Sequence, residues 1–239
     1  MDLLRSFIGP KCFKYLLVER NFLDVSCLKL LLSKCLSLGI VLLSSVIKVP
    51  QIMKIVRAKS VVGLSLAAFA LELFGYTISV AYNLVKGYPF GTYGEIVFLT
   101  IQDVFILLLM FAYGKRKAVS LFVATVYCVF AYQLFIPDFQ RQYLPALHSL
   151  TLPIIMVSRL PQIVANFRAK STGQLSAVTV VAYFAGAMAR VFTTIQEVND
   201  KSILTSFLVS TVLNFILVVQ LWIYRRSAMA PSPQRQKQQ

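Results

Sequence analysis

PQIMKIVRAKSVVGLS, residues 50–65, occurs a second time in this chain as PQIVANFRAKSTGQLS, residues 161–176. Nine of the sixteen positions are identical, and the two copies lie 111 residues apart. Each copy follows an apolar run and contains a basic turn, and a basic residue, Lys48 or Arg159, stands two positions before each proline. Repetition at a fixed period is typical of a duplicated structural unit. The repeat therefore predicts two copies of one helical arrangement.

The Pro-Gln pair of each copy has a mechanical consequence for the helix that contains it. Proline removes a helical hydrogen bond and clashes with the carbonyl four residues back, which frees the carbonyls of Val46 and Val157. The neighbouring glutamines, Gln51 and Gln162, carry donors and an acceptor that can satisfy backbone groups where lipid cannot. We therefore expect hinges at Pro50 and Pro161, each with a polar amide beside it.

The composition indicates an integral membrane protein. Of the 239 residues, 58% are hydrophobic and 14% are charged, whereas a soluble domain carries about 25% charged residues. The net charge of +15 would suggest nucleic acid as the partner of a soluble protein. In a membrane protein, basic residues collect on cytoplasmic loops, so we expect no nucleic-acid partner.

Apolar runs long enough to span a membrane recur along the chain. A helix needs about 20 apolar residues to cross the hydrocarbon, and seven candidates qualify: 35–56, 64–85, 94–113, 118–137, 143–166, 175–196 and 202–224. Four spans separate the two Pro-Gln copies, so the repeats have the same orientation. The predicted fold is all-α, with seven transmembrane helices arranged as two parallel three-helix repeats joined by a linker helix.

The predicted organisation divides the chain into five parts. These are an N-terminal lumenal or interfacial segment, the first repeat, the linker helix, the second repeat and a basic cytosolic tail, at 1–34, 35–113, 114–142, 143–224 and 225–239. Residues 22–34 are either a separate interfacial helix or an extension of the first span. Cys12 and Cys27 could form a disulfide if the N-terminal segment is lumenal.

Loop charge predicts the orientation. One set of interhelical segments and the C-terminal tail hold eleven basic residues, whereas the opposite loops hold only Lys86, Arg141 and Lys201. The positive-inside rule then places the N-terminus in the lumen and the C-terminus in the cytosol. Six basic residues before Cys35 disagree with this orientation. The final RQKQQ resembles a dibasic endoplasmic reticulum retrieval signal, although an ordinary positive tail has the same composition.

Polar residues inside the predicted spans are functional candidates, because such groups are costly in lipid. Asp103 and Asn214 are related by the 111-residue repeat, and Gln102 is adjacent; Glu72 lies in the second span without an obvious partner. These groups predict either a pseudo-symmetric central cavity or polar ties between helices. For Glu72, proton linkage and simple pairing both remain open.

Arg190 is a cation within an otherwise apolar helix, and Glu197 follows two turns later on the same face. The two residues could form an ion pair, or Arg190 could meet an anionic ligand, because a guanidinium forks onto phosphate oxygens. His148 is the single histidine and has no ligand at metal-binding spacing. We therefore expect no metal, no cofactor and no catalytic residue, so the chain is not expected to be an enzyme.

The doubled Pro-Gln motif resembles the PQ-loop family of seven-helix membrane proteins, which is related to SWEET sugar carriers and the lysosomal cystine transporter. Further segments resemble the mannose-P-dolichol utilization defect 1 family within it. These segments are CLKLLLSKCLSLGIVLLSSVIKVPQ, RAKSVVGLS, the Gly94–Glu95 pair, STGQLSAVTV and ARVFTTIQE, and together they cover roughly residues 27–224.

This resemblance implies an endoplasmic reticulum membrane protein needed for lumenal use of mannose-P-dolichol and glucose-P-dolichol. Those lipids donate sugars for N-glycosylation, O- and C-mannosylation and GPI anchors. The expected partners are these lipid-linked sugars, membrane lipid and lumenal glycosyltransferases. The expected binding residues are Arg190 for the phosphate, and Asp103, Asn214, Gln102, Gln51, Gln162 and Glu72 for polar contacts. Two alternatives stay open: a transporter of a small sugar or amino acid, and a non-transporting scaffold for glycosyltransferases.

Overall fold

The computed structural model describes residues 9–15, 19, 24–62, 64–114, 117–170, 177–198 and 200–224. Over these residues it is helical and contains no strand. The basic tail 225–239 and its retrieval-like sequence lie outside the described residues. The helices are α2 (Pro10–Phe13), α3 (Val25–Ser44), α4 (Val49–Ala58), α5 (Leu66–Val85), α6 (Phe90–Tyr113), α7 (Lys117–Gln133), α8 (Pro137–Ser149), α9 (Thr151–Ala169), α10 (Ala177–Glu197) and α11 (Lys201–Ile223).

Four helical segments in the described part of the chain are long and apolar enough to cross a membrane. They are Val25–Ala58, Leu66–Val85, Phe90–Tyr113 and Lys201–Ile223, and the bent pair α7–α8 brings the number to five if it counts as one span. These agree with the predicted spans 35–56, 64–85, 94–113 and 202–224. The chain is thus a multi-pass membrane protein, but the predicted arrangement of seven spans in a 3+1+3 order is not confirmed.

The predicted span 143–166 is wrong in its boundaries, because the chain divides between α8 and α9. Pro153 is the third residue of α9, and its ring would clash with the carbonyl of Ser149 if one helix ran through both positions. The hydroxyl of Ser149 donates to the carbonyl oxygen of Ala146 over 2.6 Å, which satisfies one of the last carbonyls of α8. The span was predicted from the number of apolar residues, which does not reveal this interruption.

The N-terminal part of α3 is an extension of the first span, not a separate interfacial helix. The carboxylate of Asp24 accepts from the backbone N–H of Cys27 over 2.8 Å and caps the helix. From Val25 the helix continues without interruption to Ser44, so the predicted boundary at residue 34 falls within it. Cys27 forms a disulfide with Cys12 of α2, as the sequence allowed.

The repeated sequence produces repeated backbone geometry. Lys59 and Lys170, the lysines of the two RAKS segments, end α4 and α9 in the left-handed conformation, with φ of 46° and 49°. They are the two non-glycine residues with positive φ in the described part of the chain. The serine at the end of the first copy, Ser65, caps α5 by accepting from the N–H of Ala68. Each copy therefore encodes one helix end, and the first also encodes the next helix start.

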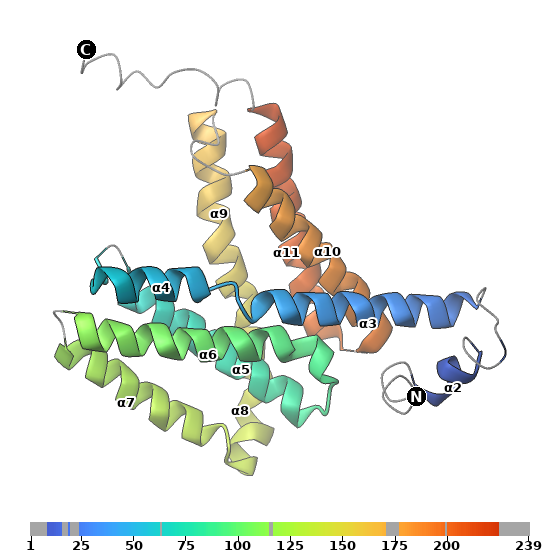
Figure 1. Ribbon diagram of the computed structural model, residues 1–239, viewed down its shortest axis with the longest axis horizontal. Coiled ribbons are helices and arrows are strands. Elements are labelled where there is room, and N and C mark those ends of the chain that lie inside the picture. The colour runs from blue at the N-terminus through green and yellow to red at the C-terminus, as the bar shows by residue number, and fades with distance from the viewer. Residues whose placement is uncertain are drawn as a thin grey trace. The chain divides into compact units, whose positions relative to one another are not determined.

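The structure separates into two compact units, Met1–Ser149 with Gln196–Val198, and Leu150–Ile195 with Asn199–Gln239. In the first unit α6 is central, and it packs against α3, α4, α5 and α7 (Figure 1). Ile106 and Met110 of α6 and Ile55 of α4 form a buried apolar cluster. α8 turns away from α7 by 111° and packs on α5, where the ring of His148 stacks on Tyr82. In this unit the lone histidine is a packed aromatic residue.

The second unit contains α9, α10 and α11. α9 and α11 lie side by side, and Phe184 of α10 packs on Phe215 of α11 with ring centroids 5.5 Å apart. The amide of Gln220 donates to the carbonyl of Ile163 over 2.9 Å and accepts from Asn166. Gln220 and Asn166 are both buried, so this bond network ties α9 to α11 within apolar surroundings.

Candidate functional site: a buried ion cluster at a helix break

The first Pro-Gln motif lies directly after a break in the first membrane-spanning segment. α3 ends at Ser44 and α4 begins at Val49, and the residues between them form tight turns with bonds of the i to i+3 type. Pro50 stands in the first turn of α4, where its missing N–H is not needed by the helix. The break therefore occurs where Pro50 would otherwise clash with the carbonyl four residues earlier.

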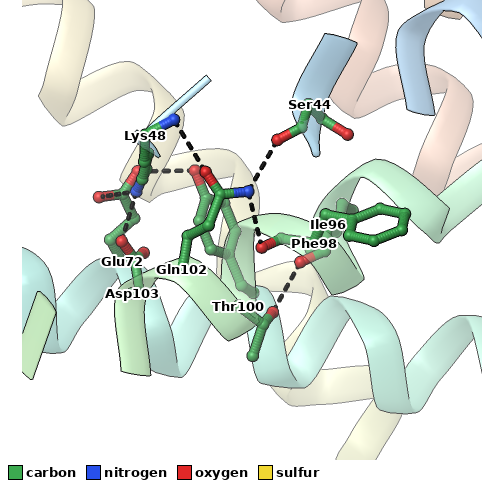
Figure 2. Close-up of polar contacts among 9 residues, drawn as sticks. Ser44, Lys48, Glu72, Ile96, Phe98, Thr100, Gln102 and Asp103 are labelled. Atoms are coloured by element: carbon green, nitrogen blue, oxygen red, sulfur yellow. Dashed lines mark hydrogen bonds and ion pairs between the residues drawn. The ribbon is translucent and has the colours of Figure 1, made fainter. Parts of the chain in front are cut away.

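Gln102 of α6 closes this break with its side-chain amide. Its nitrogen donates to the carbonyls of Ser44 and Ser45 at 2.8 and 3.3 Å, and its oxygen accepts from the backbone N–H of Lys48 at 2.8 Å. Figure 2 shows the side chain of Gln102 between Ser44 and Lys48, on the two sides of the break. Backbone groups exposed by the break would otherwise be unsatisfied in lipid. The amide predicted to serve the break was that of Gln51, whose side chain makes no hydrogen bond in the described part of the structure.

Lys48, the last residue of the break, carries its ammonium group into a cluster of two carboxylates. The ammonium lies 2.5 Å from Asp103 Oδ1 and 3.0 Å from Glu72 Oε2 (Figure 2). It also faces the ring of Tyr76, at 5.4 Å from the centroid, and the hydroxyl of Tyr76 donates to Glu72 Oε1 over 2.6 Å. We call Lys48, Glu72, Tyr76 and Asp103 the ion cluster.

The ion cluster has an uneven balance of charge and of hydrogen bonds. One ammonium faces two carboxylates, which leaves one negative charge when both are ionised. Asp103 is 0% exposed, and its second oxygen, Oδ2, has no hydrogen-bond partner among the described residues. Glu72 is 37% exposed at its side chain, so the cluster opens on that side. A buried carboxylate oxygen without a partner is costly, and it could accept a proton or a hydroxyl donor from a ligand.

The second repeat keeps a cation at the position of Lys48 but has neutral residues at the positions of the two carboxylates. The 111-residue offset relates Lys48 to Arg159 and Asp103 to Asn214, and it relates Glu72 to Tyr183. In the second unit the guanidinium of Arg159 lies over the ring of Tyr183, at 4.8 Å from the centroid. Asn214 is buried and donates to the carbonyl of Ser210 at 2.9 Å, while its Oδ1 has no partner among the described groups. The two carboxylates of the ion cluster thus have no counterpart at the equivalent positions of the second repeat.

The break is confined to the first repeat as well. Pro161 lies inside α9, which is continuous from Thr151 to Ala169. The residue related to Gln102 by the offset is Leu213, an apolar side chain that cannot bind exposed backbone groups. Helix break, amide and carboxylates therefore occur together in one repeat, although the Pro-Gln motif occurs in both.

A second buried carboxylate, Glu197, belongs to the first unit. Its side chain is 2% exposed and accepts from Ser33 Oγ at 2.5 Å, Lys34 Nζ at 2.8 Å and Ser37 Oγ at 3.2 Å. Glu197 thus forms an ion pair with Lys34, which the sequence did not predict, and the predicted pairing with Arg190 stays a prediction. Arg190 itself is a buried side chain of the second unit, 4% exposed.

The sequence identified three members of the site but missed the residue that joins them. Glu72, Gln102 and Asp103 were predicted, and the structure brings them together around Lys48. The signal for Lys48 was its position two residues before the proline, which Arg159 shares. Of the other predicted residues, Gln51 and Gln162 are half-buried on α4 and α9, and Pro50 and Pro161 are exposed.

Comparison with known proteins agrees with the duplicated geometry. Residues 32–92 and 145–203 each match the PQ loop repeat. The chain belongs to the PQ-loop repeat family. Over 184 residues it is 31% identical to human solute carrier family 66 member 3, an alignment that covers 77% of this chain and 89% of that protein.

The PQ-loop match locates the site relative to the repeat. The first matched stretch contains Lys48 and Glu72 and ends before Gln102 and Asp103. The proline break and the cluster's lysine thus lie within the PQ-loop repeat, whereas α6 supplies the amide and the second carboxylate from beyond the matched stretch.

Proposed function

We propose that this PQ-loop protein binds dolichol-phosphate-linked mannose and glucose in the endoplasmic reticulum membrane and supports their use on the lumenal side. The observation that carries the proposal is the fully buried Oδ2 of Asp103, which has no hydrogen-bond partner among the residues that the structure describes. A sugar hydroxyl is a donor of the right strength and size for this oxygen. Glu72, half-exposed beside it, offers a second carboxylate, and two adjacent carboxylates suit the neighbouring hydroxyls of a hexose.

The segments that resemble the mannose-P-dolichol utilization family support the proposal in a second way. CLKLLLSKCLSLGIVLLSSVIKVPQ contains Ser33, Lys34 and Ser37, and ARVFTTIQE ends with Glu197; these four residues form one largely buried polar group in the first unit. Two segments whose contacting residues are at least 160 positions apart therefore carry complementary parts of one contact. This is a structural reason for the two segments to occur together.

Reconstitution tests the proposal directly. Purified protein in liposomes would be loaded with radiolabelled mannose-P-dolichol, and both bound lipid and its movement between leaflets would be measured. We expect saturable binding by the wild type and a loss of roughly tenfold to a hundredfold in affinity for Asp103→Asn, since one charge-assisted hydrogen bond contributes roughly 1.5–3 kcal/mol. Asn214→Ala serves as the matched variant in the second repeat. Absence of binding by well-folded wild type would overturn the proposal.

A small-solute transporter is the second candidate, because the similar human protein is named a solute carrier. Discontinuous membrane helices with polar groups at the break are also a feature of transporter binding sites. In this case the ion cluster would bind a free sugar or amino acid, or exchange a proton with it. Uptake of labelled free mannose or amino acids by the same liposomes, without binding of mannose-P-dolichol, would favour this candidate.

A further inference from the structure

An open hollow lies along one face of α4, immediately after the helix break. Its volume is about 570 Å³, and it is lined by Pro50, Met53, Lys54, Arg57 and Ala58. These residues recur three or four positions apart, so they form one stripe on the helix surface. All five are exposed. Pro50, the proline of the first PQ-loop motif, thus also lines this hollow.

Two cations line the hollow without a neutralising partner. Lys54 and Arg57 make no salt bridge to any described carboxylate, in contrast to Lys34 and Lys48, which are paired with Glu197 and with the ion cluster. Side chains at this spacing on a helix have Cβ atoms about 5–6 Å apart, so an anion between them would relieve their repulsion. A guanidinium beside an ammonium suits phosphate oxygens in particular.

Apolar side chains accompany these cations on α4. Met53 within the hollow and Val49 and Val56 on the same helix are 45%, 37% and 44% exposed. A free phosphate ion gains nothing from such surface, whereas a phosphate attached to a hydrocarbon chain would cover it. The combination of two cations and exposed apolar residues therefore favours an amphiphilic anion.

We propose that the Lys54–Arg57 face of α4 binds the phosphate of a polyisoprenyl-phosphate sugar, with the lipid chain against Met53 and its apolar neighbours. This inference rests on the function proposed above and names the site for the phosphate, which the sequence had assigned to Arg190. The second repeat has Ala165 and Arg168 at the equivalent positions. It therefore lacks one of the two cations, and the phosphate site belongs to the first repeat.

Photo-crosslinking in nanodiscs tests this site with the full chain. The probe is radiolabelled mannose-P-dolichol with a diazirine in the lipid chain, in phosphatidylcholine discs. We expect the affinity to fall about tenfold or more in Lys54→Ala/Arg57→Ala, because two charge-assisted hydrogen bonds are lost. Lys54→Ala alone, which reproduces the second repeat, should give a smaller loss, and Arg168→Ala should remain within about twofold of wild type.

Competition with unlabelled lipids shows which class of phosphate-bearing lipid the site binds. Unlabelled dolichyl phosphate should displace the probe, whereas dolichol and phosphatidylserine at equal concentration should not. Displacement by phosphatidylserine as strong as that by dolichyl phosphate would overturn the proposal in favour of a general anionic-lipid surface. Equal crosslinking of wild type and both α4 variants would overturn this site while leaving the proposed function intact. No saturable crosslinking of wild type would overturn both.

Discussion

Lys48 shows how one side chain can serve two purposes at a helix break. Its backbone N–H bonds to Gln102, and its ammonium bonds to Asp103 of the same helix α6 and to Glu72 of α5. Lys48 therefore connects the break before α4 to α6, through Gln102 and Asp103, and to α5, through Glu72. Since Glu72 is half-exposed while Asp103 is fully buried, the pair to Asp103 is the one least screened by solvent.

Removal of the lysine charge should leave the buried carboxylate of Asp103 facing the half-exposed carboxylate of Glu72. We expect Lys48→Met to lower the free energy of unfolding by about 3–5 kcal/mol, the usual effect of breaking a buried ion pair from one side. Adding Asp103→Asn, which copies Asn214 of the second repeat, should recover much of this loss. Thermal unfolding of the purified variants in detergent measures both effects. If the double variant is less stable than Lys48→Met, Lys48 and Asp103 do not act as a buried ion pair.

The amide of Gln102 can be tested with the residue that the second repeat places at the same position. We expect Gln102→Leu to lower the free energy of unfolding by roughly 1–3 kcal/mol, because the carbonyl of Ser44 and the N–H of Lys48 lose their partner. Thr100→Val is a suitable control, since the hydroxyl of Thr100 bonds only to Ile96 of its own helix (Figure 2). If the thermal unfolding midpoint of Gln102→Leu equals that of this control, the backbone groups at the break do not depend on Gln102 for their hydrogen bonds.

At the scale of the element, the two PQ-loop prolines have different structural roles although they belong to the same repeated motif. Pro50 lies in the first turn of α4 after a break, whereas Pro161 lies inside the continuous helix α9. The difference follows from their surroundings, because the first repeat has Gln102 to bind the exposed backbone and the second has Leu213. The same motif thus tolerates a break only where a polar partner is available.

Substitution of the two prolines should therefore have opposite effects on stability. Pro161→Leu restores a donor inside α9 and should stabilise the protein by about 0.5–1.5 kcal/mol, the net contribution of one hydrogen bond. Pro50→Leu restores no bond and gives the unfolded chain more freedom, so we expect a loss of about 0.4–1 kcal/mol. Scanning fluorimetry of both variants is sufficient. Shifts of the same sign would mean that the two helices are equivalent after all.

At the scale of the whole molecule, the disulfide bears on the orientation of the chain. The Cys12–Cys27 bond is expected in an oxidising compartment, which supports the predicted lumenal N-terminus. The basic residues near this end, which conflict with the charge rule, are partly neutralised. Lys14 pairs with Glu19 at 3.4 Å and Lys34 with Glu197 at 2.8 Å.

Thiol labelling tests this orientation. In denatured protein from intact microsomes, we expect a polyethylene-glycol maleimide to modify Cys35 and Cys128, the two free cysteines, and to modify four only after reduction. The Cys12→Ser variant should expose a third reactive thiol without reduction. In sealed microsomes, a C-terminal tag should be digested by added protease. Four reactive thiols before reduction, or a protected tag, would reverse the predicted topology.

The sequence by itself determined the features that depend on residues close together in the chain. The composition indicated the membrane environment, and the repeat predicted two copies of one helical arrangement; the structure then showed that the matching Lys59 and Lys170 both have positive φ. Four of the predicted spans were also recovered. Local patterns suffice here because helix ends and apolar stretches are set by neighbouring residues. The division at Pro153 was missed because the average apolarity of 143–166 does not depend on where a proline stands.

Only the tertiary structure decided which buried polar groups are partners. A polar residue in an apolar helix shows that it needs a partner, but the sequence does not show which helix supplies it. Gln102 binds backbone 54 to 58 positions away, and Glu197 binds side chains at least 160 positions away. These choices follow from helix packing, because a hydrogen bond needs its atoms within about 3 Å. The repeat suggested two equivalent sites, and packing around Gln102 and Asp103 produced an ion cluster at the first one.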